Sequence, residues 1–135
     1  MSSSPSRNPS RPLSPHLAIW RWGPHMLVSI LHRVTGGALT VAGLALLCWW
    51  LIATASGGDA YATFSAVAMH PLGLVVLIGL TWAFFQHLFS GLRHLVMDIG
   101  AGFELGVNKL MAVGSIVAAL IATAIVWAYL LGAFA

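Results

Sequence analysis

Residues 38–55 read "ALTVAGLALLCWWLIATA", and this stretch contains no charged side chain. It lies within a longer uncharged interval, numbered 34–58, between Arg33 and Asp59. A helix needs about 20 predominantly apolar residues to cross about 30 Å of hydrocarbon, and this interval exceeds that length. Because backbone groups in lipid must be satisfied within the segment, a helix is the form that such a run takes. The stretch therefore predicts that the chain crosses a membrane.

Two further uncharged intervals follow, at 60–92 and at 110–135, and each is also long enough to span. Of the 135 residues, 59% are hydrophobic and only 7% are charged, whereas about a quarter are charged in an ordinary soluble domain. We therefore predict an all-α membrane protein with three transmembrane helices. The predicted ranges of these helices are 26–54, 71–97 and 108–133.

The basic residues lie on one side of this predicted topology. Four precede or begin the first helix and two flank the second connection; they are Arg7, Arg11, Arg21, Arg33, Arg93 and Lys109. The first connection and the C-terminus carry neither Lys nor Arg. By the positive-inside rule, the N-terminus and the second connection face the cytoplasm or matrix, and the C-terminus faces the other side. Basic residues spread along membrane flanks form no basic face, so we expect no nucleic-acid partner.

Residues 1–25 are predicted to form a surface arm, and residues 26–135 the transmembrane domain. The prolines at positions 5, 9, 12 and 15 exclude a continuous amphipathic helix in the arm. We expect the arm to be flexible at its start and to lie along the membrane surface from Arg11 onward. Trp20 and Trp22 suit the interface, where the ring lies in lipid and its N–H reaches water.

The six histidines are the unusual feature of so apolar a chain. His16 and His25 precede the first predicted span and His70 precedes Pro71 at the start of the second, so all three can be hydrated. The other three, His32, His87 and His94, lie within predicted spans, where polar side chains are costly and often functional.

His87 and His94 are seven residues apart, so they share one helix face and are separated by about 10 Å along the axis. That distance prevents them from ligating the same metal ion. Counted from Asp98, His94 lies about 6 Å deep and His87 about 16 Å deep, near the middle of the bilayer. Two interpretations of His87 stay open from the residues alone. It either hydrogen-bonds across helices or is an axial ligand of a haem whose second ligand comes from another chain.

The first helix contains a second polar group in "SILHRVTGG", residues 29–37. Ser29 and Arg33 are four residues apart and share a face near the helix end, and His32 occupies the adjoining face. An arginine in this position can also simply extend its head group toward water.

Arg93 and His94 lie at a similar predicted depth on the second helix. Together with the polar group of the first helix, they suit haem propionates, the carbonyls of a quinone, or both. Gly36 and Gly37 would allow a neighbouring helix or a flat ligand to approach closely, as small residues do at helix crossings.

Three segments together resemble the cytochrome b membrane-anchor subunits of succinate dehydrogenase, respiratory complex II. They are "RPLSPHL" at 11–17, "SILHRVTG" at 29–36 and "HLFSGLRHLVMDIG" at 87–100. The last is the most specific, with His, three variable positions, Gly, an aliphatic residue, Arg-His and an Asp four residues later. The resemblance spans nearly the whole chain and includes the order of the segments.

This resemblance implies a role for each matching residue. His87 is the expected axial ligand of haem b, and a second, hydrophobic anchor subunit is expected to supply the opposite ligand. Ser29 and Arg33 match residues that line the ubiquinone site. The residues expected near the haem propionates are His32, Arg93 and His94.

The resemblance also implies partners. These are a flavoprotein subunit with FAD that oxidises succinate to fumarate, and an iron–sulfur subunit whose clusters carry electrons to the quinone. The "RPLSPH" arm is expected to run under the iron–sulfur subunit. The chain has one cysteine and no dinucleotide-binding fingerprint, so we expect it not to be catalytic alone. The implied location is the bacterial cytoplasmic membrane, or otherwise the mitochondrial inner membrane.

Two other functions remain compatible with the residues alone. In a channel or proton-relay protein, His32, His87 and His94 would line a water path. In a purely structural anchor, the same histidines would only join helices. A b-type haem spectrum of the purified complex separates both from the cytochrome interpretation.

Overall fold

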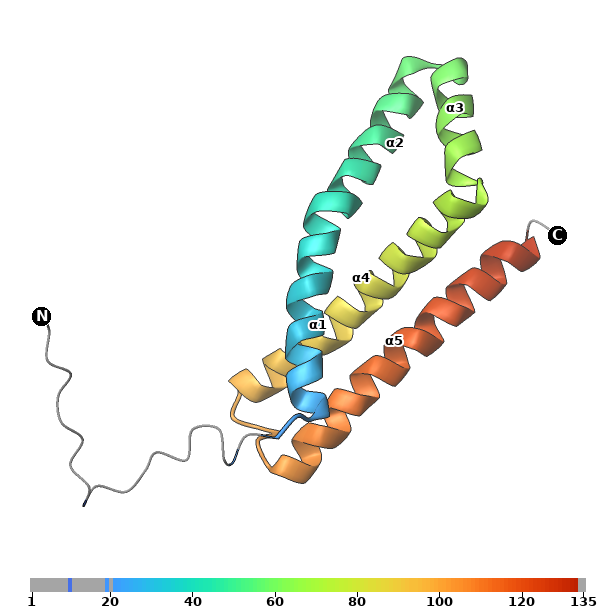
Figure 1. The fold of residues 1–135 in the computed structure, drawn as a ribbon. Helices are drawn as coiled ribbons and strands as arrows, with labels where there is room; N and C mark the ends of the chain where they lie inside the picture. The colour runs from blue at the N-terminus through green and yellow to red at the C-terminus, as the bar shows by residue number, and fades with distance from the viewer. Residues whose placement is uncertain (1–9, 11–18, 20, 134–135) are drawn as a thin grey trace, which may run out of the picture.

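The computed structural model describes residues 10, 19 and 21–133. Most of the predicted surface arm therefore lies outside the described residues. The described chain is helical, and its elements are shown in Figure 1. In chain order they are α1 Pro24–Ala38, the π-helical turn η1 Leu39–Gly43, α2 Leu44–Ser56, α3 Gly58–Ala68, α4 Pro71–Asp98 and α5 Leu105–Ala133.

Three helices are long and apolar enough to cross a membrane, which confirms the predicted fold class. They are Pro24–Ser56, which combines α1, η1 and α2, then Pro71–Asp98 and Leu105–Gly132. Each extends slightly beyond its predicted range at one or both ends.

Proline and glycine account for several helix ends. Pro24 and Pro71 lie in the first turns of α1 and α4, where the missing N–H has no intrahelical partner to lose. The His70 side chain accepts a hydrogen bond from the Leu72 N–H and so caps α4. Gly57, with a φ of 106°, follows α2 in a conformation that favours glycine.

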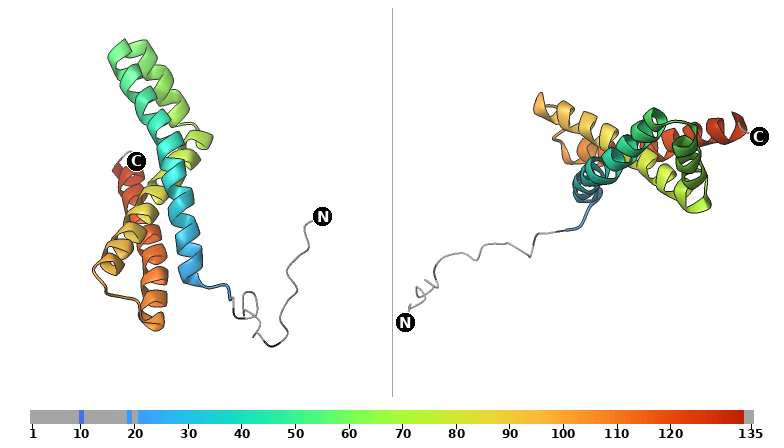
Figure 2. Two further views of the ribbon diagram at one scale, coloured as in Figure 1. Left: turned by 90° about the vertical axis from the view of Figure 1, so that its left-hand side faces the viewer. Right: turned by 90° about the horizontal axis from the view of Figure 1, so that it is seen from above.

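The α3 helix differs from the prediction, which treated this region as a connection between two spans. Figures 1 and 2 show α3 folding back beside α2, so that the pair protrudes past the start of α4. Asp59 lies in the first turn of α3, where a carboxylate interacts favourably with the helix dipole. Trp49 of α2 meets Phe64 of α3 edge to face, with ring centroids 5.1 Å apart. Packing against α2 therefore helps to form a helix too short to span a membrane.

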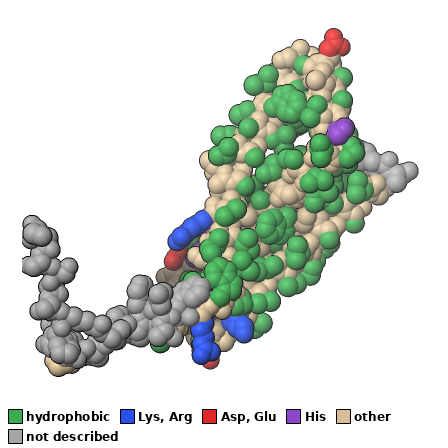
Figure 3. Space-filling view, viewed as in Figure 1, with side chains coloured by type: hydrophobic (Ala, Val, Ile, Leu, Met, Phe, Trp, Pro, Cys, Tyr) green, Lys and Arg blue, Asp and Glu red, His purple; other side chains and the backbone are tan. Residues whose placement is uncertain are grey.

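The interior of the bundle consists largely of small side chains. The buried hydrophobic residues are Val28, Ala53, Ala83, Ala112 and Ala119. Most large hydrophobic side chains are exposed instead, and they cover the body of the molecule in Figure 3. Small residues between helices allow close packing in lipid, where the hydrophobic effect does not drive association.

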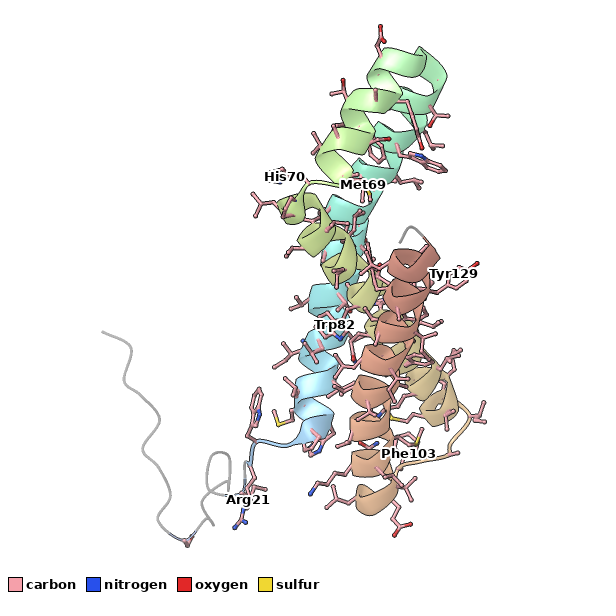
Figure 4. All side chains as sticks on the ribbon, turned by 90° about the vertical axis from the view of Figure 1, so that its right-hand side faces the viewer. Arg21, Met69, His70, Trp82, Phe103 and Tyr129 are labelled. Carbon is pink, nitrogen blue, oxygen red and sulfur yellow. The ribbon has the colours of Figure 1, made fainter. Side chains whose placement is uncertain are left out.

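Charged side chains lie toward the two ends of the molecule. In Figure 3, Lys and Arg occur at the end where α1 and α5 begin, and acidic groups occur at both ends. Figure 4 labels Arg21 and Phe103 at the first end and Met69 and His70 where α3 meets α4. This distribution agrees with the basic bias of the sequence, and the direction of insertion stays a prediction.

Candidate functional site

Three histidines from α1 and α4 meet inside the bundle. The His32 ring on α1 stacks on the His87 ring on α4, with centroids 3.9 Å apart and an angle of 11° between the planes. His94, two turns further along α4, meets the His32 ring edge to face at 5.0 Å. The two histidines of α4 therefore share the face toward α1, as their seven-residue spacing predicts. We call these three residues the histidine cluster.

The hydrogen bonds of His87 fix which ring nitrogen carries the proton. Its Nδ1 atom lies 3.1 Å from the His32 carbonyl oxygen and 3.4 Å from the Thr35 hydroxyl oxygen. The carbonyl can only accept, and the Thr35 hydroxyl already donates to the Leu31 carbonyl at 2.7 Å. Both neighbours therefore act as acceptors, which assigns the proton to Nδ1. The lone pair of the neutral ring is then on Nε2, which makes no hydrogen bond to any described residue.

Gly36 of α1 forms one wall of the space that the His87 ring occupies. A Cβ atom at position 36 would lie 2.9 Å from Cε1 and 3.3 Å from Nδ1 of His87. The first of these distances is shorter than real Cβ contacts, so the ring fits only because this position lacks a side chain. At the next position, Gly37, an added Cβ atom would meet nothing within 4 Å.

The other histidine of the stacked pair, His32, is held by α4. Its Nδ1 atom lies 2.7 Å from the hydroxyl oxygen of Ser90, which is fully buried. Since the Ser90 hydroxyl donates to the Gln86 carbonyl at 2.6 Å, it accepts from the His32 N–H. Hydrogen bonds thus cross between α1 and α4 in both directions.

Ser29 and Arg33 lie one turn apart on α1 and outside the histidine cluster. Ser29 is half-buried and Arg33 is exposed. Neither side chain forms a hydrogen bond or ion pair with any described residue. The hydroxyl and the guanidinium therefore remain able to bind another molecule.

Arg93 and His94, which the sequence places at a similar depth, contact different helices: the Arg93 head group contacts α5 and the His94 ring contacts α1. Arg93 is 6% exposed, and its Nη2 atom donates to Oδ1 of Asn108 on α5 at 2.7 Å. Consecutive helical residues point about 100° apart, so Arg93 and His94 face different neighbours of α4. Arg93 also lines a groove of about 320 Å³ between α4 and α5, together with Phe89 and Ser115 among others.

The histidine cluster does not form a complete metal site. Within the described ranges, no group of three or more His, Cys, Asp or Glu side chains is placed to hold a metal ion. The one cysteine, Cys48, is exposed on α2. The three imidazoles of the histidine cluster therefore do not converge on one metal ion.

Comparison with known proteins identifies a family for this chain. A family model described as the succinate dehydrogenase/fumarate reductase transmembrane subunit matches residues 7–126. The chain belongs to this family. The "succinate dehydrogenase cytochrome b556 subunit" of Paracoccus denitrificans is 45% identical over 96 residues, which cover 71% of this chain and 73% of the relative.

More distant members show the same relationship. The cytochrome b556 subunit of Rickettsia felis is 35% identical over 117 residues, covering 87% of this chain and 90% of the relative. The mitochondrial cytochrome b560 subunit of Sus scrofa is 36% identical over 100 residues, covering 71% of this chain and 57% of the relative.

As a member of the succinate dehydrogenase cytochrome b family, the chain is a membrane-anchor subunit of an oxidoreductase and is not catalytic alone. Its three apolar helices and its bacterial and mitochondrial relatives support a multi-pass inner-membrane protein.

Sequence reasoning missed two residues of the site. Thr35 lies three positions after His32, a spacing that places it on a neighbouring part of the same helix surface. Asn108 is the uncharged polar residue beside Lys109 at the start of α5, and nothing in its local sequence identifies Arg93 as its partner.

Proposed function

We propose that this chain binds haem b jointly with a second anchor subunit and contributes to the ubiquinone-reduction site of a succinate:quinone oxidoreductase. The observation that carries the proposal is the hydrogen bonding of His87. Its Nδ1–H donates to the His32 carbonyl, which leaves Nε2 available. Metal-bound histidines commonly donate their second ring N–H to a carbonyl or carboxylate in this way.

The residues present fit a haem on two further grounds. His87 is half-buried, so part of its surface is accessible from outside the chain, where another subunit can approach. Gly36 lets the ring pack closely against α1, because a Cβ atom at this position would overlap Cε1 of His87. A bound haem would supply one-electron chemistry; His87 would hold it from this chain, and the second ligand would come from the partner anchor.

His32 and His94 are the residues we assign to the vicinity of the haem propionates. Both belong to the histidine cluster, and each ring lies within 5.0 Å of its neighbour, measured between centroids. Arg93 was expected in the same group, but its hydrogen bond to Asn108 directs its head group toward α5. We therefore assign Arg93 a structural role at the α4–α5 contact.

Ser29 and Arg33 are assigned to the quinone site. Reduction of a quinone to a quinol takes two electrons and two protons, so its site needs donors aimed at the carbonyl oxygens and access to water. The Ser29 hydroxyl can donate to one carbonyl oxygen, and the Arg33 guanidinium can stabilise negative charge that develops there. Both side chains lie on α1, in the N-terminal part of the Pro24–Ser56 span, and lack partners among the described residues.

The same proposal includes the assembly. The flavoprotein subunit with FAD and the iron–sulfur subunit would bind on the cytoplasmic or matrix side, where the basic residues predict the N-terminus to be. The second anchor subunit would contact this chain beside His87. The arm of residues 1–25 would then lie between the membrane surface and the iron–sulfur subunit.

The haem spectrum of the purified complex tests the role of His87. We expect His87→Ala to abolish or displace the low-spin b-type signal, while part of the complex still assembles. His70→Ala, which removes an imidazole at the opposite end of α4, is the matched control and should retain the signal. An unchanged spectrum in His87→Ala removes His87 from its proposed role.

A purely structural role is the second candidate, because His32 and His87 both form hydrogen bonds between α1 and α4. It predicts that the wild-type complex has no dithionite-reduced b-type spectrum and that His87→Ala only lowers assembly. A channel or proton-relay protein would likewise lack this spectrum.

A further inference from the structure

The segment of α1 from His32 to Gly36 contacts one edge of the His87 ring at several points. The His32 carbonyl lies 3.1 Å from Nδ1, the Thr35 hydroxyl lies 3.4 Å from it, and the Gly36 backbone adjoins Cε1. The His32 ring covers one face of the His87 ring at 3.9 Å. Thr35 itself is 1% exposed, so this side of the ring is closed to water.

We propose that Gly36, assisted by Thr35, is a positioning residue that sets the orientation and the donor strength of the His87 imidazole toward iron. This inference rests on the proposed haem ligation by His87. Neither residue offers an atom to the iron itself. Both act through the His87 ring, because they determine how closely its Nδ1–H approaches the His32 carbonyl.

Steric contact gives Gly36 its influence on the ring. A methyl group at this position would lie 2.9 Å from Cε1, so either the ring or α1 must move. The stacked His32 ring restricts movement on one face, and the hydrogen bond to the His32 carbonyl restricts rotation. Relief of the overlap therefore lengthens or breaks the Nδ1–H to carbonyl hydrogen bond.

The electronic consequence has a defined direction. A hydrogen bond from Nδ1–H to a carbonyl makes the imidazole a more basic ligand. A more basic ligand stabilises ferric iron relative to ferrous iron, which lowers the reduction potential. Weakening this hydrogen bond should therefore raise the haem potential, and tilting the ring should change the electron paramagnetic resonance of the low-spin ferric state.

Gly36→Ala and Gly37→Ala form a matched pair for this test. Both add one methyl group to adjacent positions of α1, and only the first meets the His87 ring. In the purified complex, we expect Gly36→Ala to shift the haem midpoint potential upward and to change the low-spin g values. Gly37→Ala should match the wild type in both measurements.

A second pair covers the case in which Gly36→Ala does not assemble. Thr35→Val removes the hydroxyl oxygen beside Nδ1 and keeps the side-chain shape, whereas Thr35→Ser retains the hydroxyl. We expect changed g values in Thr35→Val and wild-type values in Thr35→Ser. If Gly36→Ala assembles and keeps the wild-type potential and g values, the inference is overturned, even when the yield of complex falls. If Gly36→Ala does not assemble, wild-type g values in Thr35→Val overturn it.

The His87→Ala variant separates this inference from the proposed function. If His87→Ala loses the haem signal while the Gly36 and Thr35 variants keep wild-type signals, His87 remains the ligand and only the positioning role fails. If His87→Ala keeps the wild-type signal, the ligand assignment and the positioning role fall together. Equal shifts in Gly36→Ala and Gly37→Ala would also overturn the positioning role, since only one of the two methyl groups contacts the ring.

Discussion

Helix α4 contacts its two neighbours through different chemistry. Toward α1 it presents His87, Ser90 and His94, and cross-helix hydrogen bonds join the middle of the contact. Toward α5 the buried side chains are mostly small. Polar contacts occur near the two ends of that contact, where Arg93 donates to Asn108 at 2.7 Å and Trp127 donates to Thr81 at 3.2 Å.

This difference separates ligand binding from helix packing on a single helix. Small residues such as Ala112 and Ala119 let α5 pack closely on α4, and the buried Ser115 and Thr123 hydroxyls donate to carbonyls of α5 itself. The α1 side instead contains imidazoles, and burial of polar groups in lipid is costly unless they are hydrogen-bonded. Substitutions on the α1 side should therefore alter cofactor or substrate chemistry in addition to stability, and substitutions on the α5 side should alter stability alone.

The largest expected effect is on the quinone reaction. Ser29→Ala and Arg33→Ala should each lower quinone reduction by roughly 10²-fold, the scale seen when one donor to a developing negative charge is removed. Succinate oxidation with an artificial acceptor should stay near the wild-type rate, because that acceptor bypasses the quinone site. The measurement compares both rates in the same purified complex.

Arg21→Ala is the control for the arginine, since Arg21 is also exposed but precedes α1. It should leave both rates near those of the wild type. Equal losses of both rates in Ser29→Ala or Arg33→Ala would mean that these residues support assembly and not the quinone site.

The next effect is on stability at the α5 side. Asn108→Leu should lower the free energy of unfolding by about 2–3 kcal/mol, because it leaves the buried Arg93 guanidinium without its partner. Thermal unfolding of the purified complex measures the loss. The haem spectrum and potential of the folded fraction should stay unchanged, since Arg93 points away from the histidine cluster.

Asn108→Asp tests the cause of that loss, because it keeps an acceptor for Arg93. It should retain most of the stability that Asn108→Leu loses. If Asn108→Leu instead shifts the haem potential, Arg93 also acts on the haem, and the separation of the two sides of α4 fails.

The three spans could be predicted from the sequence because charge-free intervals of sufficient length determine them. The α3 helix could not, since its 11 residues include Asp59 and its helical form depends on packing against α2. The π-helical turn at Leu39–Gly43 was also missed. Hydrophobicity is uniform through this part of the span and gives no sign of a change in hydrogen-bond register.

Helical periodicity predicted which residues of the candidate site share a helix face, but not the contacts between helices. A spacing of seven residues correctly placed His87 and His94 on one face of α4. Arg93 and His94 were grouped because they lie at a similar depth. Their side chains point in different directions around α4, and Arg93 contacts Asn108 because α5 lies on its side of the helix. The contact of Gly36 with the His87 ring depends on the distance between α1 and α4, which no local pattern reveals.

The smallest expected effect compares two buried serines on the two sides of the bundle. Ser90 is 0% exposed and Ser115 is 6% exposed, and each hydroxyl donates to a carbonyl of its own helix. Only Ser90 also accepts a hydrogen bond across helices, from His32 at 2.7 Å. Ser90→Ala should therefore lower the free energy of unfolding by about 1–2 kcal/mol, because it leaves the His32 N–H unpaired.

Ser115→Ala should change the free energy of unfolding by less than about 0.5 kcal/mol. Its hydroxyl donates only to the Ala112 carbonyl of the same helix, so its loss leaves no group of another helix without a partner. The two variants remove the same atom from similarly buried positions, so side-chain volume cannot explain a difference between them. Thermal unfolding of the two complexes under identical conditions gives the comparison. Equal losses would mean that the His32 to Ser90 hydrogen bond adds nothing to the stability of the α1–α4 contact beyond packing. Binding of the haem or the quinone would then be the only reason for polar residues on this side of α4.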